Sequence, residues 1–381
     1  MTSSESSGRL TARDVLGVPT MPPAKASAAL NRLRDRVLRL HRRMAPPPVQ
    51  ILESLFGLLD HRVLVALCQA GVPEALTGAV RVEELARRTS TDPAVLERLV
   101  RYAATRGWLR IDRRGLLRPT GVTAFLRSDH PGGWRAWVDF AGGTDVVVAV
   151  QHLSASGLAD PFAAAHGVPF FDWMATHPDR GKAFDGAMEA GARMHGLALA
   201  TSLEWAARGS VCDVGGGTGA LLATLLEFVP EMTGTVLDLP TVVAGAVEHP
   251  RLTAVAGDAF DSVPTGFDTY LLVNVLHDWS DDDATRILAT VARAAADQAR
   301  VVVVEADATV RPIAGIGVAA DVLMAALTPG GRERTTEELR ALGKRAGLHL
   351  ASRTPLASGD VAWTFTGEAP HDGRLRPNMS S

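Results

Sequence analysis

The chain has 381 residues, of which 46% are hydrophobic and 21% charged, and its formal net charge is −3. The length predicts two domains, or one large domain with an appendage, and the composition is ordinary for a globular protein. The nearly neutral charge gives no electrostatic reason to expect nucleic acid or a membrane surface as a partner.

The two cysteines, Cys68 and Cys212, each lie in an apolar run. This placement indicates buried thiols and neither a disulfide nor a metal site. The sequence shows no apolar stretch of membrane-spanning length and no signal-peptide pattern, so we expect a cytoplasmic protein.

The N-terminal segment combines two kinds of sequence. Residues 1–24 are rich in Ser, Gly and Pro, and are predicted to lack regular structure. Residues 26–43 interleave arginines with leucines and valines at helical spacing, which predicts a basic amphipathic helix ended by prolines 46–48. Such helices bind membranes or nucleic acid in some proteins. Here the neutral overall charge favours a solvated helix that packs on a partner subunit.

Residues 51–126 follow a helical pattern with short turns. A short helix at 82–86, a second helix beginning near Pro93 and a hairpin of segments 109–112 and 116–119 are the pattern of a winged helix. A DNA-binding version would use arginines of the second helix and the turn after it: Arg98, Arg101 and Arg106. That helix is more apolar than basic, so DNA reading is not the favoured interpretation.

Residues 131–200 hold the densest supply of aromatic and methionine side chains. Most are expected to form a core between helices, and a subset to line an apolar pocket for a planar ligand. After residue 205 strands and helices alternate, which predicts a doubly wound α/β sheet with ligands at the carboxyl ends of its strands. The predicted strands are 211–214, 234–238, 252–255, 268–275, 300–305 and 361–365.

The first predicted strand leads into a glycine-rich turn, Asp213-Val-Gly-Gly-Gly-Thr-Gly219, and then into a helix. This arrangement brings a bound nucleotide close to backbone amides, and the glycines permit both the approach and positive φ. Read as Gly215-x-Gly217-x-x-Ala220, the turn satisfies a dinucleotide fingerprint. Read from Asp213, it resembles motif I of the S-adenosylmethionine (SAM) methyltransferases. The turn alone leaves both cofactors open.

Polar residues mark the ends of the next strands. Asp238 is placed to accept hydrogen bonds from ribose hydroxyls, in a dehydrogenase or a methyltransferase alike. Asp258 is placed to accept from an adenine amine, while Phe260 packs on the ring. His277 follows the fourth strand and precedes an acidic run, which favours a general base over a core histidine. Glu305 ends a strand of four valines, where a carboxylate needs a histidine or a solvated cleft as its neighbour.

Together these segments resemble the class I SAM-dependent O-methyltransferases of plant caffeate-type and bacterial polyketide pathways, over roughly residues 50–367. The motifs that carry the resemblance are Asp213–Gly219, Asp238-Leu-Pro240, Gly257-Asp-Ala-Phe260, Leu276-His-Asp-Trp-Ser-Asp281, Gly330-Gly-Arg-Glu-Arg-Thr335 and Phe184-Asp-Gly-Ala-Met188. The resemblance implies a Rossmann-like α/β domain, an N-terminal winged-helix domain that forms a homodimer, and SAM as cofactor. The implied domains are an N-terminal extension 1–48, a dimerisation domain 49–130, a helical substrate region 131–204, a SAM domain 205–367 and a tail 368–381.

The resemblance also assigns residues to roles. The implied cofactor contacts are Asp213, Gly215, Gly217, Asp238, Asp258, Ala259 and Phe260. The implied catalytic set is His277, Glu305 and Glu333, and the implied acceptor contacts are Phe184, Met188, Asp278 and Met324. A phenol has an ordinary pKa of about 10, so His277 would take the hydroxyl proton while the two glutamates orient the imidazole. The partner is then a small aromatic acceptor, and neither metal, membrane nor nucleic acid is expected.

Two departures from the family pattern concern the cofactor pocket. Val273 stands where many relatives carry a polar residue, often Lys, and Ala259 stands where many plant members have a larger side chain. Three alternatives stay open: a SAM-binding relative that catalyses decarboxylation, hydroxylation or a pericyclic step, a winged-helix regulator that senses a small ligand, and a nicotinamide dehydrogenase. An intact set of His277, Glu305 and Glu333 favours methyl transfer.

Overall fold

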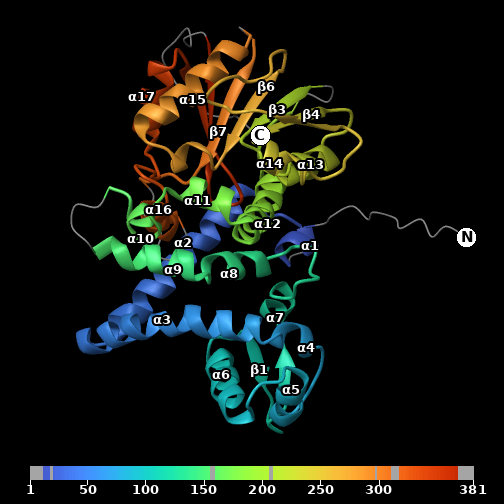
Figure 1. Cartoon of the computed structure of the whole chain (residues 1–381), viewed down its shortest axis with the longest axis vertical. Coiled ribbons are helices and arrows are strands. Elements are labelled where there is room, and N and C mark those ends of the chain that lie inside the picture. The colour runs from blue at the N-terminus through green and yellow to red at the C-terminus, as the bar shows by residue number, and fades with distance from the viewer. Residues whose placement is uncertain are drawn as a thin grey trace, which may run out of the picture.

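The computed structural model describes residues 12–17, 20–154, 159–205, 209–296, 298–309 and 317–367. Figure 1 shows the α/β sheet at one end of the molecule, a small helical domain at the other, and helices α8 to α12 between them. The expectations for residues 1–11 and for the tail 368–381 fall outside the described residues.

The small domain has the predicted winged-helix order. Its elements are α3 (Pro47–Gln69), α4 (Val72–Ala75), α5 (Val82–Arg88), α6 (Pro93–Thr105), β1 (Leu109–Ile111), β2 (Leu117–Pro119) and α7 (Gly121–Phe125). The predicted start of α6 is confirmed: the Asp92 side chain accepts a hydrogen bond from the Val95 amide, and Pro93 occupies the first turn. Strands β1 and β2 pair antiparallel, as the hairpin pattern predicted.

Two helices precede this domain. The predicted basic helix is α2 (Ala24–Met44), which ends before Pro46 as expected, whereas Pro47 and Pro48 form the start of α3. Within the first 24 residues a short helix, α1 (Ala12–Leu16), forms where the sequence predicted no regular structure. It contacts α12, and its Val15 is buried, so tertiary packing overrides the weak local pattern.

The middle layer holds the aromatic-rich segment. It consists of α8 (Arg135–Ala141), α9 (Thr144–Gln151), the 3₁₀ turn η1 (His152–Ser154), α10 (Pro161–His166), α11 (Phe170–Thr176) and the long α12 (Pro178–Ser202). Phe140, Phe162 and Phe170 form a buried cluster with Met174, as the prediction of a helical core required. Helix α16 (Gly317–Leu327) packs on α9 and α10 although it lies far away in the sequence.

The sheet has seven strands in the order β5-β4-β3-β6-β7-β9-β8. They are β3 (Ser210–Val214), β4 (Thr233–Asp238), β5 (Leu252–Ala256), β6 (Thr269–Val273), β7 (Arg300–Glu305), β8 (His349–Pro355) and β9 (Val361–Thr366). β3 to β7 are parallel, and β9 runs antiparallel to both β7 and β8. The carboxyl ends of the parallel strands therefore share one edge, at the side of the middle layer (Figure 1).

Helices cover both faces of the sheet. Side chains of α15 (Asp281–Ala294) and α17 (Thr336–Arg345) pack against one face, and those of α12 and α13 (Ala220–Phe228) against the other. Short helix α14 (Pro240–Val243) contacts β4 and β5. Successive residues of a strand point to opposite faces of the sheet. Cys212 therefore packs in the core with α15 and α17, and Val211 in the core with α12 and α13.

Two strand predictions need correction. β8 was not predicted, because its sequence His-Leu-Ala-Ser-Arg-Thr-Pro is polar for a strand and it lies at the edge of the sheet. The predicted strand 268–275 ends already at Val273, since Asn274 has φ +53° and turns the chain out of the sheet. Residues Leu276–Asp278 then form the 3₁₀ turn η2.

Candidate active site

The glycine turn lies between β3 and α13. Gly215, Gly217 and Gly219 have φ of +69°, +61° and +81°, a backbone that other residues rarely adopt. A Cβ built at Gly217 would meet no atom within 4 Å, so the space next to the turn is open. The turn leads into α13, as the sequence predicted; Gly215 is exposed, while the amides of Gly215 and Gly217 donate to Leu237 and Asp238.

Carboxylates from β3, β4 and β5 line this part of the sheet edge. Asp213 is buried, and its Oδ2 has no hydrogen-bond partner among the described residues. Burial raises the pKa of Asp213 to about 8, and the charge of Asp238 adds to the rise. Asp238 accepts hydrogen bonds from the Gly217 amide at 2.8 Å and the Leu239 amide at 2.7 Å. Two neighbouring strands therefore end in acidic side chains that lie within electrostatic reach of each other.

The end of β5 supplies the third acid. Asp258 is exposed, and its Oδ1 accepts a hydrogen bond from the Phe260 amide at 2.8 Å, which fixes the turn. Ala259 is half-buried between these two residues. The Phe260 ring lies under the Arg286 guanidinium and edge-on to Trp279 at 4.8 Å, and is therefore held in place. We call Asp213, the glycine turn, Asp238 and residues 258–260 the cofactor side.

His277 lies in η2, beyond the end of β6. Its Nδ1 is 3.1 Å from Oε1 of Glu333, and its Nε2 is 3.7 Å from Oδ1 of Asp278. Oε1 of Glu305, at the end of β7, accepts a hydrogen bond from the His277 backbone amide at 2.9 Å. The structure thus brings together all four residues, although they span more than 50 positions of the chain.

The two glutamates act on different parts of His277. Glu333 contacts the imidazole, whereas the hydrogen bond of Glu305 goes to the main chain and fixes the turn. Oε2 of each glutamate is buried without a hydrogen-bond partner among the described residues. The sequence-based expectation that both glutamates orient the imidazole is refined accordingly: Glu333 orients it directly and Glu305 through the backbone.

Charges around His277 dominate its protonation. Burial by itself would lower the pKa of His277, but Asp278, Glu333 and Glu305 raise the pKa to about 10. Burial raises the pKa of Asp278 to about 6 and that of Glu305 to about 7, while the His277 charge works against both rises. The imidazolium form of His277 is therefore favoured at neutral pH. We call His277, Asp278, Glu305 and the loop 328–335 the base side.

The loop 328–335 is held against the His277 turn by contacts that the sequence analysis did not assign. The Arg332 amide donates to the His277 carbonyl at 2.8 Å. Arg334 is fully buried, donates to the carbonyls of Leu276 and Trp279 at 2.6 Å each, and pairs with Asp281 at 2.9 Å. The Gly-Gly-Arg-Glu-Arg-Thr motif marked this loop in the sequence. The directions in which the Arg332 and Arg334 side chains point, however, depend on the fold.

The close approach of the loop 328–335 to the His277 turn also explains why residue 331 is a glycine. A Cβ at Gly331 would lie 2.8 Å from the His277 carbonyl oxygen and closer still to the Thr328 hydroxyl. Any side chain at this position would push the loop away from the turn. Asp321 of α16 adds another anchor, because its Oδ1 accepts from the Glu333 amide at 2.8 Å.

Of the predicted acceptor residues, Phe184 and Met188 lie on α12, Met324 on α16 and Asp278 in η2. Phe184 and Met188 of α12 are half-buried and pack against the aromatic cluster, and the Phe184 ring is 5.3 Å from the rings of both Phe140 and Phe170. On α16, Met324 is half-buried, and its neighbour Leu323 packs against the same cluster. Phe171 packs against the aromatic cluster, and its ring stacks on the Trp279 ring with centroids 5.7 Å apart. It therefore links the aromatic cluster to the turn that holds His277.

Comparisons with known proteins identify the family of this chain. The family model of the O-methyltransferase domain matches residues 146–349, and that of the O-methyltransferase dimerisation domain matches residues 52–126. The O-methyltransferase SfmM3 of Streptomyces lavendulae is 32% identical, over 80% of this chain and 96% of the relative.

The chain belongs to the O-methyltransferase family.

Two further relatives indicate the range of this family. The aclacinomycin 10-hydroxylase RdmB of Streptomyces purpurascens is 33% identical, over 83% of this chain and 88% of the relative. The solved structure of NcsB1, an O-methyltransferase from neocarzinostatin biosynthesis in complex with SAM and 2-hydroxy-5-methyl naphthoic acid, has a TM-score of 0.66 and 30% identity, and covers 81% of this chain and 95% of that chain.

The cofactor of this O-methyltransferase is SAM, which decides against the dinucleotide interpretation of the glycine turn. The residues present fit that cofactor: the unpartnered Asp213 oxygen and the acceptors Asp238 and Asp258 match the ammonium, hydroxyl and amine donors of SAM. Burial raises the pKa of Asp185 on α12, and the charges of Asp238 and Glu189 add to the rise, so α12 reaches the cofactor side.

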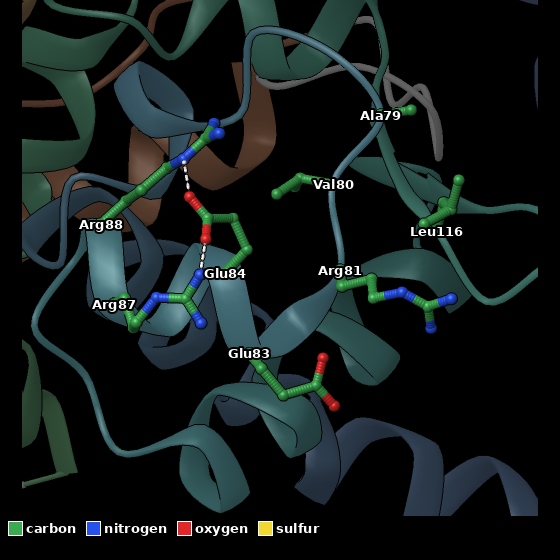
Figure 2. Close-up of a pocket in the computed structure, with 8 residues that line it drawn as sticks. All are labelled: Ala79, Val80, Arg81, Glu83, Glu84, Arg87, Arg88 and Leu116. Atoms are coloured by element: carbon green, nitrogen blue, oxygen red, sulfur yellow. Dashed lines mark hydrogen bonds and ion pairs between the residues drawn. The ribbon is translucent and has the colours of Figure 1, made fainter.

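A shallow hollow of about 430 Å³ lies in the small domain, away from the sheet edge. Figure 2 shows that Glu84 there is paired with both Arg87 and Arg88. The hollow is open and lies within the matched dimerisation domain. We therefore assign the chemistry to the sheet edge and not to this hollow.

Among the residues that the structure describes, no set of three or more His, Cys, Asp and Glu side chains is arranged to hold a metal ion. None of the helices in the same ranges combines the length and apolar character that crossing a membrane requires.

Proposed function

We propose that this O-methyltransferase transfers the methyl group of SAM to an aromatic hydroxyl of a small secondary metabolite, with His277 as general base. The observation that carries the proposal is the His277–Glu333 contact at 3.1 Å, at the edge of the sheet that carries the cofactor residues. A base held by a carboxylate on one ring nitrogen presents the other nitrogen to its substrate.

The hydrogen bond to Glu333 selects the useful form of the neutral imidazole. Because Glu333 accepts at Nδ1, the proton of neutral His277 stays there and the lone pair lies on Nε2. Asp278, whose carboxylate lies beside Nε2, stabilises the imidazolium that forms when the phenol proton is taken up. The raised pKa of His277, about 10, is close to the ordinary pKa of a phenol, so the proton transfer is nearly balanced.

The remaining residues bind and orient. Asp213, Asp238 and Asp258 hold SAM, which supplies an electrophilic methyl group when bound. Phe184 and Met188 provide an apolar wall on α12, and an aromatic acceptor suits such a wall because ring faces pack on methionine and phenylalanine. The relatives support this class of acceptor, since NcsB1 was solved with a naphthoic acid.

The test is a transfer assay with SAM and a panel of phenols, hydroxynaphthoic acids and matched aryl amines, analysed by mass spectrometry over a pH series. We expect methylation of hydroxyl groups, with formation of S-adenosylhomocysteine (SAH). Below the pKa of His277 the rate should rise about tenfold per pH unit, because only the neutral imidazole accepts a proton. Methylation of the amines alone, or a rate independent of pH, would refute the proposed acceptor or base.

A second activity has one specific observation in its favour: RdmB, at 33% identity, is named a hydroxylase. The assay separates the two, because hydroxylation adds the mass of oxygen to the acceptor. The close His277–Glu333 contact favours methyl transfer, since a held base serves the removal of a hydroxyl proton.

We also propose that the partner in the dimer covers α2 as well as the matched dimerisation domain. Leu30, Leu33, Val37, Leu40 and Met44 recur on α2 at steps of three and four, and each is more than half exposed. Such a seam suits packing of one helix on another. The face continues on α3, where Leu55, Phe56 and Leu58 are 66%, 57% and 63% exposed. A contiguous apolar surface of this kind marks an interface.

Sedimentation of the full chain tests this proposal. Leu33→Asp and Phe56→Asp should each weaken the dimer by more than about 1 kcal/mol, because each would bury an unpaired charge. Val168→Asp, at an exposed residue between α10 and α11 and outside both α2 and the matched dimerisation domain, is the control. A dimer unaffected by Leu33→Asp would show that α2 lies outside the interface.

A further inference from the structure

A second histidine–carboxylate pair lies beside the base side. His195 is on α12, on the same helix face as Phe184 and Met188, because the steps of four and seven residues return to one side of a helix. His195 is buried, with 7% of the residue exposed. Its partner is Asp360, from the turn between β8 and β9, 165 residues away in the sequence.

The hydrogen bonds of His195 define its charge. Its Nδ1 lies 3.0 Å from the Gly191 carbonyl oxygen, and its Nε2 lies 2.9 Å from Oδ2 of Asp360. A carbonyl and a carboxylate both accept, so each nitrogen must carry a proton and the ring is an imidazolium. In agreement, burial would lower the pKa of His195, yet the hydrogen bond and charge of Asp360 raise it. The pKa of Asp360 is lowered, because His195 outweighs the effect of burial.

The sheet places this pair next to the base. Asp360 directly precedes β9, whose first residue, Val361, pairs with Glu305 at the end of β7. The charge of His277 acts on both members of the pair: it lowers the pKa of His195 and the pKa of Asp360. The pair is therefore within electrostatic reach of His277, on the side of α12 and the β8–β9 turn.

The anions that surround His277 explain why Asp360 needs a cation as its neighbour. Asp278, Glu305 and Glu333 already face His277 from η2, β7 and the loop 328–335, and Arg334, which reaches the same turn, is committed to two carbonyls and Asp281. An unpaired Asp360 would add a further buried anion to this set. Such an anion would stabilise the imidazolium of His277 and keep the base protonated.

We propose that His195 is a positioning residue that neutralises Asp360 beside the base and ties the acceptor-lining helix α12 to the β8–β9 turn. The proposal rests on the proposed role of His277 as general base. The His195–Asp360 ion pair then balances the charge of the base side and also holds Phe184 and Met188 in position through α12.

The experiment is a pH titration of imidazole resonances by NMR, on the full-length protein labelled with ¹⁵N-histidine and saturated with SAH. His195 should show two protonated ring nitrogens at neutral pH. In His195→Gln, which keeps a donor but removes the charge, the titration midpoint of His277 should rise by about 0.5 to 1 pH unit. In the double variant His195→Gln/Asp360→Asn the midpoint should return toward the wild-type value.

The matched control is His249→Gln. His249 also pairs with a carboxylate, Glu227, at 3.3 Å, but it precedes β5 and so lies at the opposite edge of the sheet. This variant should leave the His277 midpoint in place. If His195→Gln does not fold, Asp360→Asn provides the second measurement, because His195 should then lose its charge at neutral pH.

A singly protonated His195 at neutral pH, or an unmoved His277 midpoint in folded His195→Gln, would overturn the proposal. The titration requires no turnover, so its failure is distinguishable from failure of the proposed function. Methyl transfer that survives His277→Gln would reject the base role, whatever the titration shows for His195.

Discussion

The cofactor side and the base side share one edge of the sheet but are built by different means. On the cofactor side, Asp238 and Asp258 are held by backbone amides one to twenty-one positions away. On the base side, His277 is held by Glu305 and Glu333, and the buried Arg334 closes the set, all from distant segments. The cofactor side therefore depends mainly on its own turns, whereas the base side depends on the docking of a remote loop.

The largest effect is expected at the base. His277→Gln should lower methyl transfer by about 10² to 10⁴, because it removes the proton acceptor. SAH affinity, measured by calorimetry, should change little, since His277 holds no group of the cofactor side. Equal losses of rate and affinity would mean that the two sides are not separable. His249→Gln is the control for replacing a buried histidine.

The docking of the loop can be broken at Arg334. Arg334→Met should lower the free energy of unfolding by about 2 kcal/mol or more, because two buried carbonyls lose their donor and Asp281 keeps only its pair with Arg332. Thermal unfolding measures this loss, and activity should fall with it. Arg340→Met is the control: its pair with Glu337 is solvent-exposed and worth about 0–1 kcal/mol. Equal stability losses in the two variants would disprove a special role of the buried arginine.

The smallest effect is expected on the cofactor side. Asp238→Ala should weaken SAH binding by about 1–3 kcal/mol, through loss of a carboxylate that two amides orient. The maximal rate at saturating SAM should fall much less than in His277→Gln. Asp261→Ala, at an exposed acid nearby, is the control. Unchanged affinity in Asp238→Ala would show that the ribose is held elsewhere.

Local patterns account for what the sequence predicted well. The glycine turn, the capped start of α6 and the alternation of apolar strands with amphipathic helices each depend on residues within a few positions of one another. The same holds for the hairpin β1–β2. Such signals survive without knowledge of the fold, because backbone conformation and helix capping are local properties.

Other features were missed because their stabilisation is not local. Strand β8 is polar and forms only because β9 offers it a partner, and α1 forms where it can pack on α12. Phe184 was expected to line the acceptor site, and the structure also packs it on Phe140 and Phe170 of the aromatic cluster.

The sequence by itself determined the α/β architecture, the winged-helix domain and the O-methyltransferase family, through short motifs in a fixed order. Only the tertiary structure decided that Glu333 contacts the imidazole while Glu305 holds its backbone, that Arg334 fastens the loop, and that His195 meets Asp360. The physical reason is the range of the interactions: φ angles and capping are set within a turn, whereas buried charges find their partners only after distant segments have packed.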